Sequence, residues 1–274
     1  MRRCPANSAV RFLAAALLLL SAALPAGKAA AQPAASDDLA AVHDRCVSYV
    51  ASHPQEGLER AKLWKEQGGG FYADHCIAMA LFQLHDYAEA AERFESAATA
   101  MLGMPALQRA KALDQAGQAW LDAHQPERAK AAFDAAIQLA GKEADLLIDR
   151  AEAWAEMQQY WNAVDDLNDA IELAPDRADA YFYRGAAYRN LNVLDLALED
   201  IEHGLSLAPH SPIGLLERGN LRRLKGDIAG ARQDWLEVSK LAPNSAEDKA
   251  ARLDIANLKG KGEGATAPAA QKTP

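Results

Sequence analysis

The sequence is poor in residues that favour β-strands, because valine, isoleucine and threonine are sparse while alanine is abundant. This composition favours helices. Beyond the first few residues the chain also lacks a basic cluster, and its formal net charge is −9. Nucleic acids and anionic lipids attract proteins through clustered positive charge. We therefore expect an all-α protein that binds neither of them.

Motifs for catalysis and for nucleotide binding are also missing. The sequence has no phosphate-binding glycine loop, no His-Glu-x-x-His and no serine elbow. The run Gly68–Gly70 lacks the lysine and the hydroxyl residue that a nucleotide loop needs. The histidines are scattered, and a lone histidine is more often a surface or core residue than a ligand. We therefore expect a non-catalytic protein without a cofactor or a bound metal.

The N-terminus has the pattern of an export signal. Three early arginines precede Phe12–Leu24, an apolar run that is too short for a normal membrane-spanning helix. Ala29 and Ala31 follow at the spacing that a signal peptidase reads, which predicts removal of residues 1–31. An uncleaved membrane anchor is the alternative. Cleavage leaves 25 basic and 38 acidic residues, so we expect a periplasmic chain of net charge −13 without membrane insertion.

Two cysteines, Cys46 and Cys76, remain after the signal is removed with Cys4. An even cysteine count in a compartment that oxidises thiols predicts a disulfide between them. Closing a loop of about 30 residues stabilises a fold by ~3.5 kcal/mol in the chain-entropy model. The predicted disulfide would therefore contribute substantially to stability.

A zinc site is an alternative use of the same cysteines, because His43 and His75 lie close to them in sequence. Adjacent residues on a helix, such as His75 and Cys76, point about 100° apart and rarely converge on one ion. Two unpaired thiols in the core are a third possibility. The disulfide remains the main prediction.

The triplet Leu-Ala-Pro occurs three times at a constant interval, and the copies end at Pro175, Pro209 and Pro243. Proline cannot continue a helix, because it lacks the amide hydrogen and clashes with the preceding turn. Each triplet therefore marks the end of a repeating helical unit. The units that follow from this spacing span residues 110–143, 144–177, 178–211 and 212–245.

Each unit contains two helical stripes. The fourth, eighth and eleventh positions form the stripe of a first helix, and the twentieth, twenty-fourth and twenty-seventh form that of a second. Small residues at the eighth position let the two helix backbones approach closely. The eighth and twenty-fourth positions are Gly117 and Phe133, Ala151 and Leu167, Gly185 and Ile201, and Gly219 and Trp235.

A pattern of this kind, repeated every ~34 residues, resembles the tetratricopeptide repeat. The resemblance implies an α-solenoid of about five helical hairpins, each an antiparallel helix pair. A fifth, less regular unit spans residues 71–104, and Pro105–Arg109 break the phase after it. The remaining segments are expected to be a degenerate N-terminal helix pair (32–70), a capping helix (246–259) and a disordered tail (260–274).

Arginine and aspartate also recur within the repeat. They stand at the same spacing in three units, and both are replaced by alanine in the unit that starts at Ala110. We interpret them as structural ion pairs between the two helices of a hairpin. The predicted pairs are Arg150 with Asp166, Arg184 with Asp200, and Arg218 with Asp234.

The resemblance further implies where a partner binds, because the first helices of tetratricopeptide repeats line a groove that commonly holds a segment of another protein. Acidic and apolar residues at the groove-facing positions suit a partner segment with basic and apolar residues. The groove residues predicted in this way are Asp145, Ile148, Glu152, Glu156, Asp179, Phe182, Arg189, Leu216, Asn220 and Arg223.

The sequence therefore predicts a monomeric, non-catalytic scaffold or adaptor of the cell envelope that binds another protein. The identity of that protein does not follow from the sequence. The alternative function is a metal- or redox-linked envelope protein that uses Cys46 and Cys76 with His43 and His75.

Overall fold

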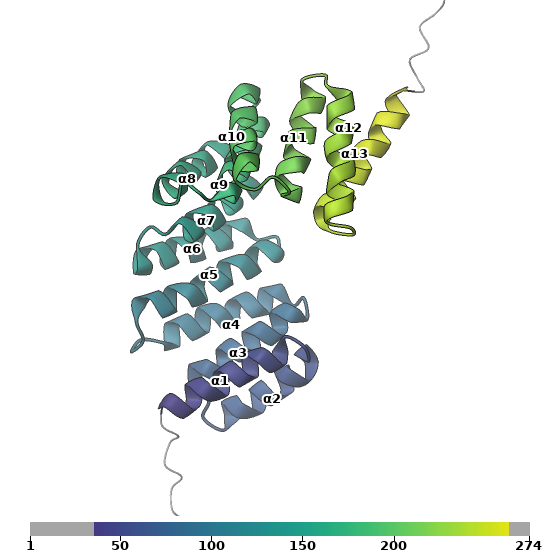
Figure 1. Cartoon of the computed structure of the whole chain (residues 1–274). Helices are drawn as coiled ribbons and strands as arrows, with labels where there is room; N and C mark the ends of the chain where they lie inside the picture. The colour runs from purple at the N-terminus through teal and green to yellow at the C-terminus, as the bar shows by residue number, and fades with distance from the viewer. Residues whose placement is uncertain (1–35, 263–274) are drawn as a thin grey trace, which may run out of the picture. The chain divides into compact units, whose positions relative to one another are not determined.

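The computed structural model describes residues 36–262, which form thirteen α-helices and contain no β-strand (Figure 1). The predicted export signal and most of the predicted tail lie outside the described residues. The helices are α1 (Ser36–Val50), α2 (Pro54–Glu66), α3 (Gly70–Gln83), α4 (Tyr87–Ala100), α5 (Ala106–Asp122), α6 (Pro126–Ala140), α7 (Ala144–Glu156), α8 (Tyr160–Leu173), α9 (Ala178–Asn190), α10 (Leu194–Leu207), α11 (Pro212–Leu224), α12 (Ile228–Leu241) and α13 (Ala246–Gly262).

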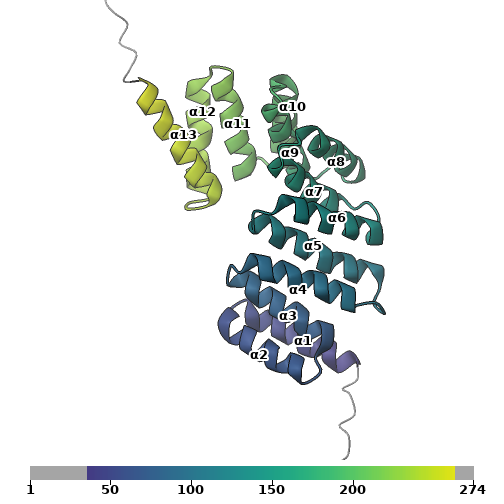
Figure 2. The same cartoon turned by 180° about the vertical axis from the view of Figure 1, so that it is seen from behind.

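Consecutive helices lie side by side as hairpins, and each hairpin packs against the next one along the chain, as the front and back views show (Figures 1 and 2). We call α5, α7, α9 and α11 the first helices and their hairpin partners α6, α8, α10 and α12 the second helices. Neighbouring first helices also contact one another directly. The predicted all-α solenoid of helical hairpins is confirmed.

Glycines allow the close approach of the two helices in a hairpin. A Cβ atom at Gly117 would collide with the ring of Phe133, and one at Gly219 would lie 2.5 Å from the indole of Trp235. A heavy atom added this close would force the ring or its helix to shift. The bulky residue of the second helix therefore occupies the space that the glycine leaves free.

The turn inside each hairpin repeats its backbone conformation. His124, Gln158, Asn192 and Gly226 occupy the same position of successive units, and each has a positive φ. The next residue closes the turn: the amide of Gln159, for example, donates to the carbonyl of Trp154 at 2.8 Å. A left-handed residue followed by a backbone bond of this kind is a Schellman cap. The cap ends the first helix and reverses the chain.

The break in repeat phase takes the form of an extra helical turn. The sequence places the start of a unit at Ala110, but α5 begins at Ala106 and contains 17 residues, whereas α7 contains 13 residues. Pro105 is the N-cap residue and stands immediately before the first helical residue. The residues that break the phase are therefore absorbed by a longer first helix, and the hairpin stack continues.

The N-terminal helices cover the end of the stack. Helix α1 packs against α2 and α3, and the sulfur atoms of Cys46 and Cys76 are joined with their Cα atoms 6.2 Å apart. Asp74 is buried where the repeat pattern has a bulky residue, and its carboxylate pairs with Lys65 and lies 3.9 Å from Arg93. An ion pair thus replaces apolar packing in this unit.

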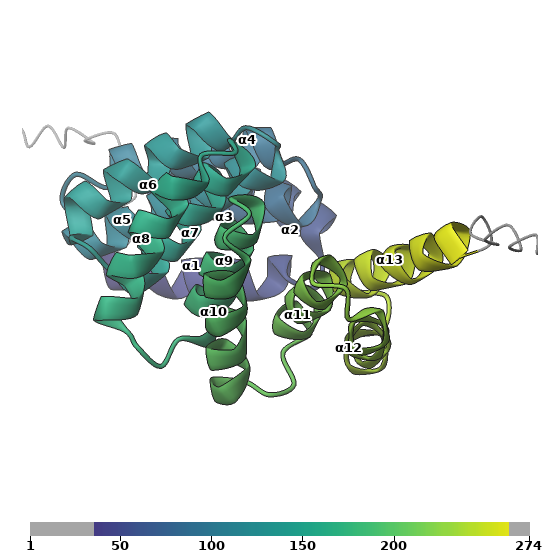
Figure 3. The same cartoon turned by 90° about the horizontal axis from the view of Figure 1, so that it is seen from above.

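Helix α13 packs against α11 and α12 (Figure 3). Its start is fixed by reciprocal bonds: the Asp248 amide donates to Ser245 Oγ at 3.1 Å, and the Asn244 amide donates to Asp248 Oδ2 at 2.8 Å. The helix continues to Gly262, so the predicted end at Lys259 is too early. None of the helices within residues 36–262 combines the length and apolar character that a membrane crossing requires.

Candidate partner-binding face

The predicted groove residues all belong to the helices α7, α9 and α11. Helix α9 contacts both α7 and α11. With α5 they form one surface of the hairpin stack. We call this surface the first-helix face. Its polar side chains, all exposed or half-buried, include those of Asp114, Asp145, Asp149, Glu152, Glu156, Asp179, Tyr183, Arg189, Asn220 and Arg223.

Two predicted groove residues are not part of this surface. Ile148 is 5% exposed and Phe182 is 3% exposed, so the prediction that they contact a partner is wrong. The ring of Phe182 fills the space beside Gly204 and Gly214, where an added Cβ atom would lie 2.5 Å from it. Gly204 lies on α10 of the same hairpin and Gly214 on α11 of the next one, so both helices close over the ring. Leu216 is half-buried and packs against the same apolar cluster.

An arginine neutralises the acidic residues near the start of α7 and α9. Arg177 binds Asp179 with two hydrogen bonds of 3.1 and 2.6 Å, and it also donates to Asp145 on the neighbouring first helix. Both aspartates are predicted groove residues, but the structure places them in an ion pair that links two hairpins. Arg177 lies outside the helices and is not a groove position of the repeat, so the family pattern offers no reason to consider it.

A second arginine on this face is also paired within the chain. Arg189 on α9 donates to Glu217 on α11 at 2.7 Å, and Asn220 donates to the same carboxylate at 3.4 Å. Arg223, one turn further along α11, is half-buried, and its Nε atom has no hydrogen-bond partner within residues 36–262. Positive charge on this part of the face is therefore largely compensated by Glu217, except at Arg223.

Two carboxyl groups from neighbouring first helices interact directly. Burial, followed by the charge of Asp114, raises the pKa of Asp149 to about 8, and burial also raises the pKa of Asp114. The Oδ1 atom of Asp114 is buried without a hydrogen-bond partner among the described residues. Two interacting carboxyl groups cannot both ionise easily, and the pKa of each is raised above its ordinary value.

Sequence reasoning missed Asp149, because it is not one of the groove positions that the family pattern supplies. The available signal was its separation from Asp114, which exceeds the repeat length by one residue. Residues with this spacing lie on adjacent first helices at neighbouring positions. A search for charged pairs separated by about one repeat length would have found the contact.

Two further predicted residues, Glu152 and Glu156, line a pocket of about 280 Å³ between the α7–α8 hairpin and α9. Burial raises the pKa of Glu152, and the neighbouring charges of Glu156 and Asp122 act in the same direction. Burial and the nearby Glu152 also raise the pKa of Tyr183, on the opposite wall, to about 12. We call this cavity the α7–α9 pocket. Its chemistry is that of an acidic site with apolar walls.

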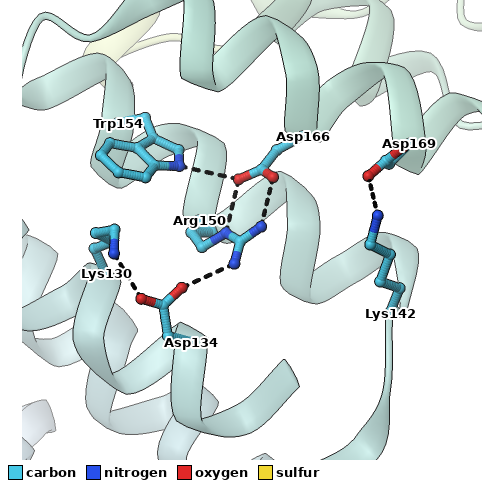
Figure 4. A network of polar contacts seen from close by, with 7 residues as sticks. All are labelled: Lys130, Asp134, Lys142, Arg150, Trp154, Asp166 and Asp169. Atoms are coloured by element: carbon cyan, nitrogen blue, oxygen red, sulfur yellow. Dashed lines mark hydrogen bonds and ion pairs between the residues drawn. The ribbon is translucent and has the colours of Figure 1, made fainter. Parts of the chain in front are cut away.

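The structure brings together the three predicted Arg–Asp pairs, each within one hairpin. Arg150 Nε and Nη2 donate to Asp166 at 2.8 and 2.6 Å, and Trp154 Nε1 donates to the same carboxylate at 3.1 Å (Figure 4). Arg150 Nη1 also donates to Asp134 of the preceding hairpin at 2.8 Å. The arginine therefore links three consecutive helices, α6 to α8.

The other two pairs have similar geometry. Arg184 donates to Asp200 at 2.8 and 2.6 Å, and Arg218 donates to Asp234 at 3.0 and 2.7 Å. Asn168 takes the place of Asp134 one repeat later, where it accepts a bond of 2.8 Å from Arg184. Each aspartate is buried and each arginine is half-buried. Their position between helices is consistent with a structural role.

The side chains considered for a metal site are arranged differently. The sulfur atoms of Cys46 and Cys76 are bonded to each other, and His43 Nε2 lies 3.0 Å from His75 Nδ1. His75 also bonds to Gln115 at 2.7 Å, and burial lowers its pKa to about 4. The four side chains do not form one ligand set, and the described residues contain no group of three His, Cys, Asp or Glu side chains placed to hold a metal.

Comparisons with known proteins identify the fold of this chain. No family model matches the chain, and no curated protein matches it. Among solved structures, MamA from Desulfovibrio magneticus RS-1 is similar, with a TM-score of 0.51 and 21% identity over 68% of this chain and 97% of that one. A crystal structure of MamA protein gives a TM-score of 0.51 and 20% identity over 62% and 91% of the two chains. The chain has the tetratricopeptide-repeat fold.

The TPR resemblance seen in the sequence is thus confirmed at the level of the fold. YrrB, described as a TPR protein with an unusual peptide-binding site, is a more distant match, with a TM-score of 0.46 and 19% identity over 67% of this chain and 91% of that one. Within this TPR fold, the first-helix face and its α7–α9 pocket are the places where the predicted acidic groove residues remain accessible.

Proposed function

We propose that this protein is a non-catalytic scaffold or adaptor of the cell envelope that binds a segment of another protein on its first-helix face. The observation that carries the proposal is the accessible acidic surface around Glu152 and Glu156, beside an open pocket. A partner segment with basic and apolar side chains complements this surface in charge and in shape.

The fold supports a binding role over a catalytic one. TPR hairpins present an extended surface built from many similar units, which suits recognition of an elongated ligand. Arg150, Arg184 and Arg218 each pair with an aspartate between packed helices, so the repeated charges have a structural explanation. The charged residues of the first-helix face do not take part in these pairs, so they remain available to contact a partner.

The envelope location rests on the sequence of residues 1–31, which has the composition of a cleavable export signal. Export into an oxidising compartment is also consistent with the joined sulfur atoms of Cys46 and Cys76. Fractionation of cells followed by N-terminal sequencing tests this part of the proposal. We expect the protein in the periplasmic fraction with Gln32 as its first residue.

Charge reversal on the first-helix face tests the binding role. We expect the wild-type protein to recover a specific partner from envelope extract after crosslinking, and the Glu152→Lys, Glu156→Lys variant to lose it. A matched control carries the same charge change at exposed positions of the second helices, Glu172→Lys with Glu199→Lys. The control should retain the partner. If the reversed variant recovers the same partner as the wild type, the first-helix face is not the binding site.

A further inference from the structure

The α7–α9 pocket has apolar walls and an acidic rim. Tyr160 and Leu167 of α8 line it together with alanines of α7, α8 and α9, while Glu152 and Glu156 supply its carboxylates. Its volume of about 280 Å³ is at the small end of ligand pockets, which typically measure about 300–1,000 Å³. A cavity of this size suits one side chain of a partner better than a whole small-molecule ligand.

The carboxylates of this pocket differ from those at the starts of α7 and α9. Asp145, at the start of α7, is paired with Arg177, and so is Asp179 on α9. Among the described residues no lysine or arginine lines the α7–α9 pocket, and the charges that act on Glu152 are those of two other acids, Glu156 and Asp122. A half-buried carboxylate surrounded by negative charge gains most from an incoming cation.

We propose that the α7–α9 pocket binds a lysine or arginine side chain of the partner segment, with the aliphatic stem against the half-buried Tyr160 and Tyr183 and the cationic group at Glu152. Long basic side chains commonly place their methylene groups on apolar surface while the charged end meets an acid. This inference rests on the proposed function, because it assigns one specificity pocket to the binding face. A metal ion is a poorer occupant, since the described residues place only two carboxylates there.

Selection from a library of random twelve-residue peptides tests the proposal and does not require that the partner be identified. The library is selected in parallel on the wild-type protein, on the Glu152→Gln, Glu156→Gln variant and on a control, Glu172→Gln with Glu199→Gln. We expect one lysine or arginine, flanked by apolar residues, to be enriched on the wild type and on the control. The pocket variant should lose this enrichment, because it keeps the shape of the pocket without its charge.

Binding measurements with one synthetic copy of an enriched peptide test whether its basic residue interacts with the carboxylates of the pocket. Replacing its basic residue by norleucine should weaken binding to the wild type about tenfold, a loss of about 1.4 kcal/mol. The pocket variant should bind the original peptide about tenfold more weakly than the wild type does. Replacing the basic residue by norleucine should not weaken binding to this variant any further. Equal melting temperatures of wild type and variant exclude unfolding as the cause.

Two outcomes overturn the proposal in different ways. If peptides are enriched without a basic residue, or if the two losses multiply independently, the pocket does not bind a cationic side chain although the face still binds segments. If no peptide is enriched on the wild-type protein, segment binding itself fails and the pocket assignment fails with it.

Discussion

Asp149 is a carboxyl group surrounded by other acidic groups from three helices. It faces Asp114 on α5, Asp145 and Glu152 on α7, and Tyr183 on α9. Burial, then the charge of Asp114, raises its pKa from 3.8 to about 8. The folded state therefore binds more protons than the unfolded state between these two values. Stability contributed by the protonated group is present at low pH and is lost as the pH rises toward 8.

The raised pKa of Asp149 leads to a prediction about how stability depends on pH. The pKa of His75 is lowered from 6.5 to about 4, so this group makes stability rise with pH between these values. Above pH 6.5 it no longer changes the stability. Between pH 6.5 and 8 the acidic pair dominates, and we expect the melting temperature to fall across this window. The Asp149→Asn variant should flatten this slope, whereas the exposed control Asp165→Asn should not. A slope that is unchanged by Asp149→Asn would contradict the assignment.

The Arg–Asp pairs allow a second prediction at the residue scale. Asp200→Ala leaves the half-buried guanidinium of Arg184 without its carboxylate, which should cost on the order of 3 kcal/mol of unfolding free energy. The α5–α6 hairpin has Ala116 and Ala132 at the corresponding positions, and both are buried. The double variant Arg184→Ala, Asp200→Ala reproduces that arrangement and should be less destabilised than Asp200→Ala alone.

Denaturant unfolding of the wild type and of these two variants measures the effect, with the exposed Glu199→Ala as a control. The structural interpretation of the pairs is wrong if Asp200→Ala leaves stability unchanged. It is also wrong if the double variant is less stable than the single one, because the uncompensated charge would then not be the cause of the loss.

At the scale of helices and turns, the Schellman cap between α7 and α8 is strained because a glutamine, and not a glycine, occupies its left-handed position. Gln158 has φ 60°, a conformation that costs a residue with a side chain roughly 1 kcal/mol more than glycine. Gly226 occupies the same place two hairpins later. We expect Gln158→Gly to raise the melting temperature by a few degrees. Gln159→Gly, where φ is −91°, should lower it, since glycine there adds freedom to the unfolded chain and removes the side-chain oxygen that accepts a bond of 2.9 Å from Asn162.

Calorimetry of the two glycine variants checks this prediction. Because the variants carry the same substitution at adjacent positions, differences in charge cannot explain opposite shifts. If both substitutions lower the melting temperature, the left-handed turn is not a source of strain in this protein.

The link between α1 and α3 gives a further prediction at this scale. The cysteines are 30 residues apart in sequence, so the Cys46→Ser, Cys76→Ser variant should lose about 3.5 kcal/mol of stability in the chain-entropy model. Intact mass should show the wild type lighter than its reduced form by two hydrogens. Reductant should lower the melting temperature of the wild type and leave the variant unchanged. A retained zinc ion in the wild type would contradict the disulfide.

The positions of most helices follow from the sequence, because the repeat period fixes which residues stop a helix and which pack between helices. Pro175 and Gly185 illustrate these two signals. The start of α5 at Ala106 could not be placed in the same way. A break in the repeat phase indicates that extra residues are present. Whether they lengthen a helix or a loop depends on packing against α4.

At the scale of the whole molecule, the binding face was only partly predictable. Family positions correctly indicate which helix a residue belongs to, but its exposure depends on the side chains of the helices packed around it. Phe182 is buried because Gly204 and Gly214 leave room for its ring. Asp179 is paired because Arg177 reaches it from the loop before α9. Glycine at positions 204 and 214 and arginine at position 177 do not recur in the other units, so the period carries no information about these contacts.

The central claim is that the first-helix face binds a partner protein, and site-specific photocrosslinking in living cells tests it most directly. A photoactivatable residue at Asn190, which lines the α7–α9 pocket, should crosslink one partner, and the Glu152→Lys, Glu156→Lys changes should abolish the product. The same residue at Glu199, exposed on α10, should give no product with that partner. A partner that crosslinks from Glu199 and not from Asn190 would contradict the account.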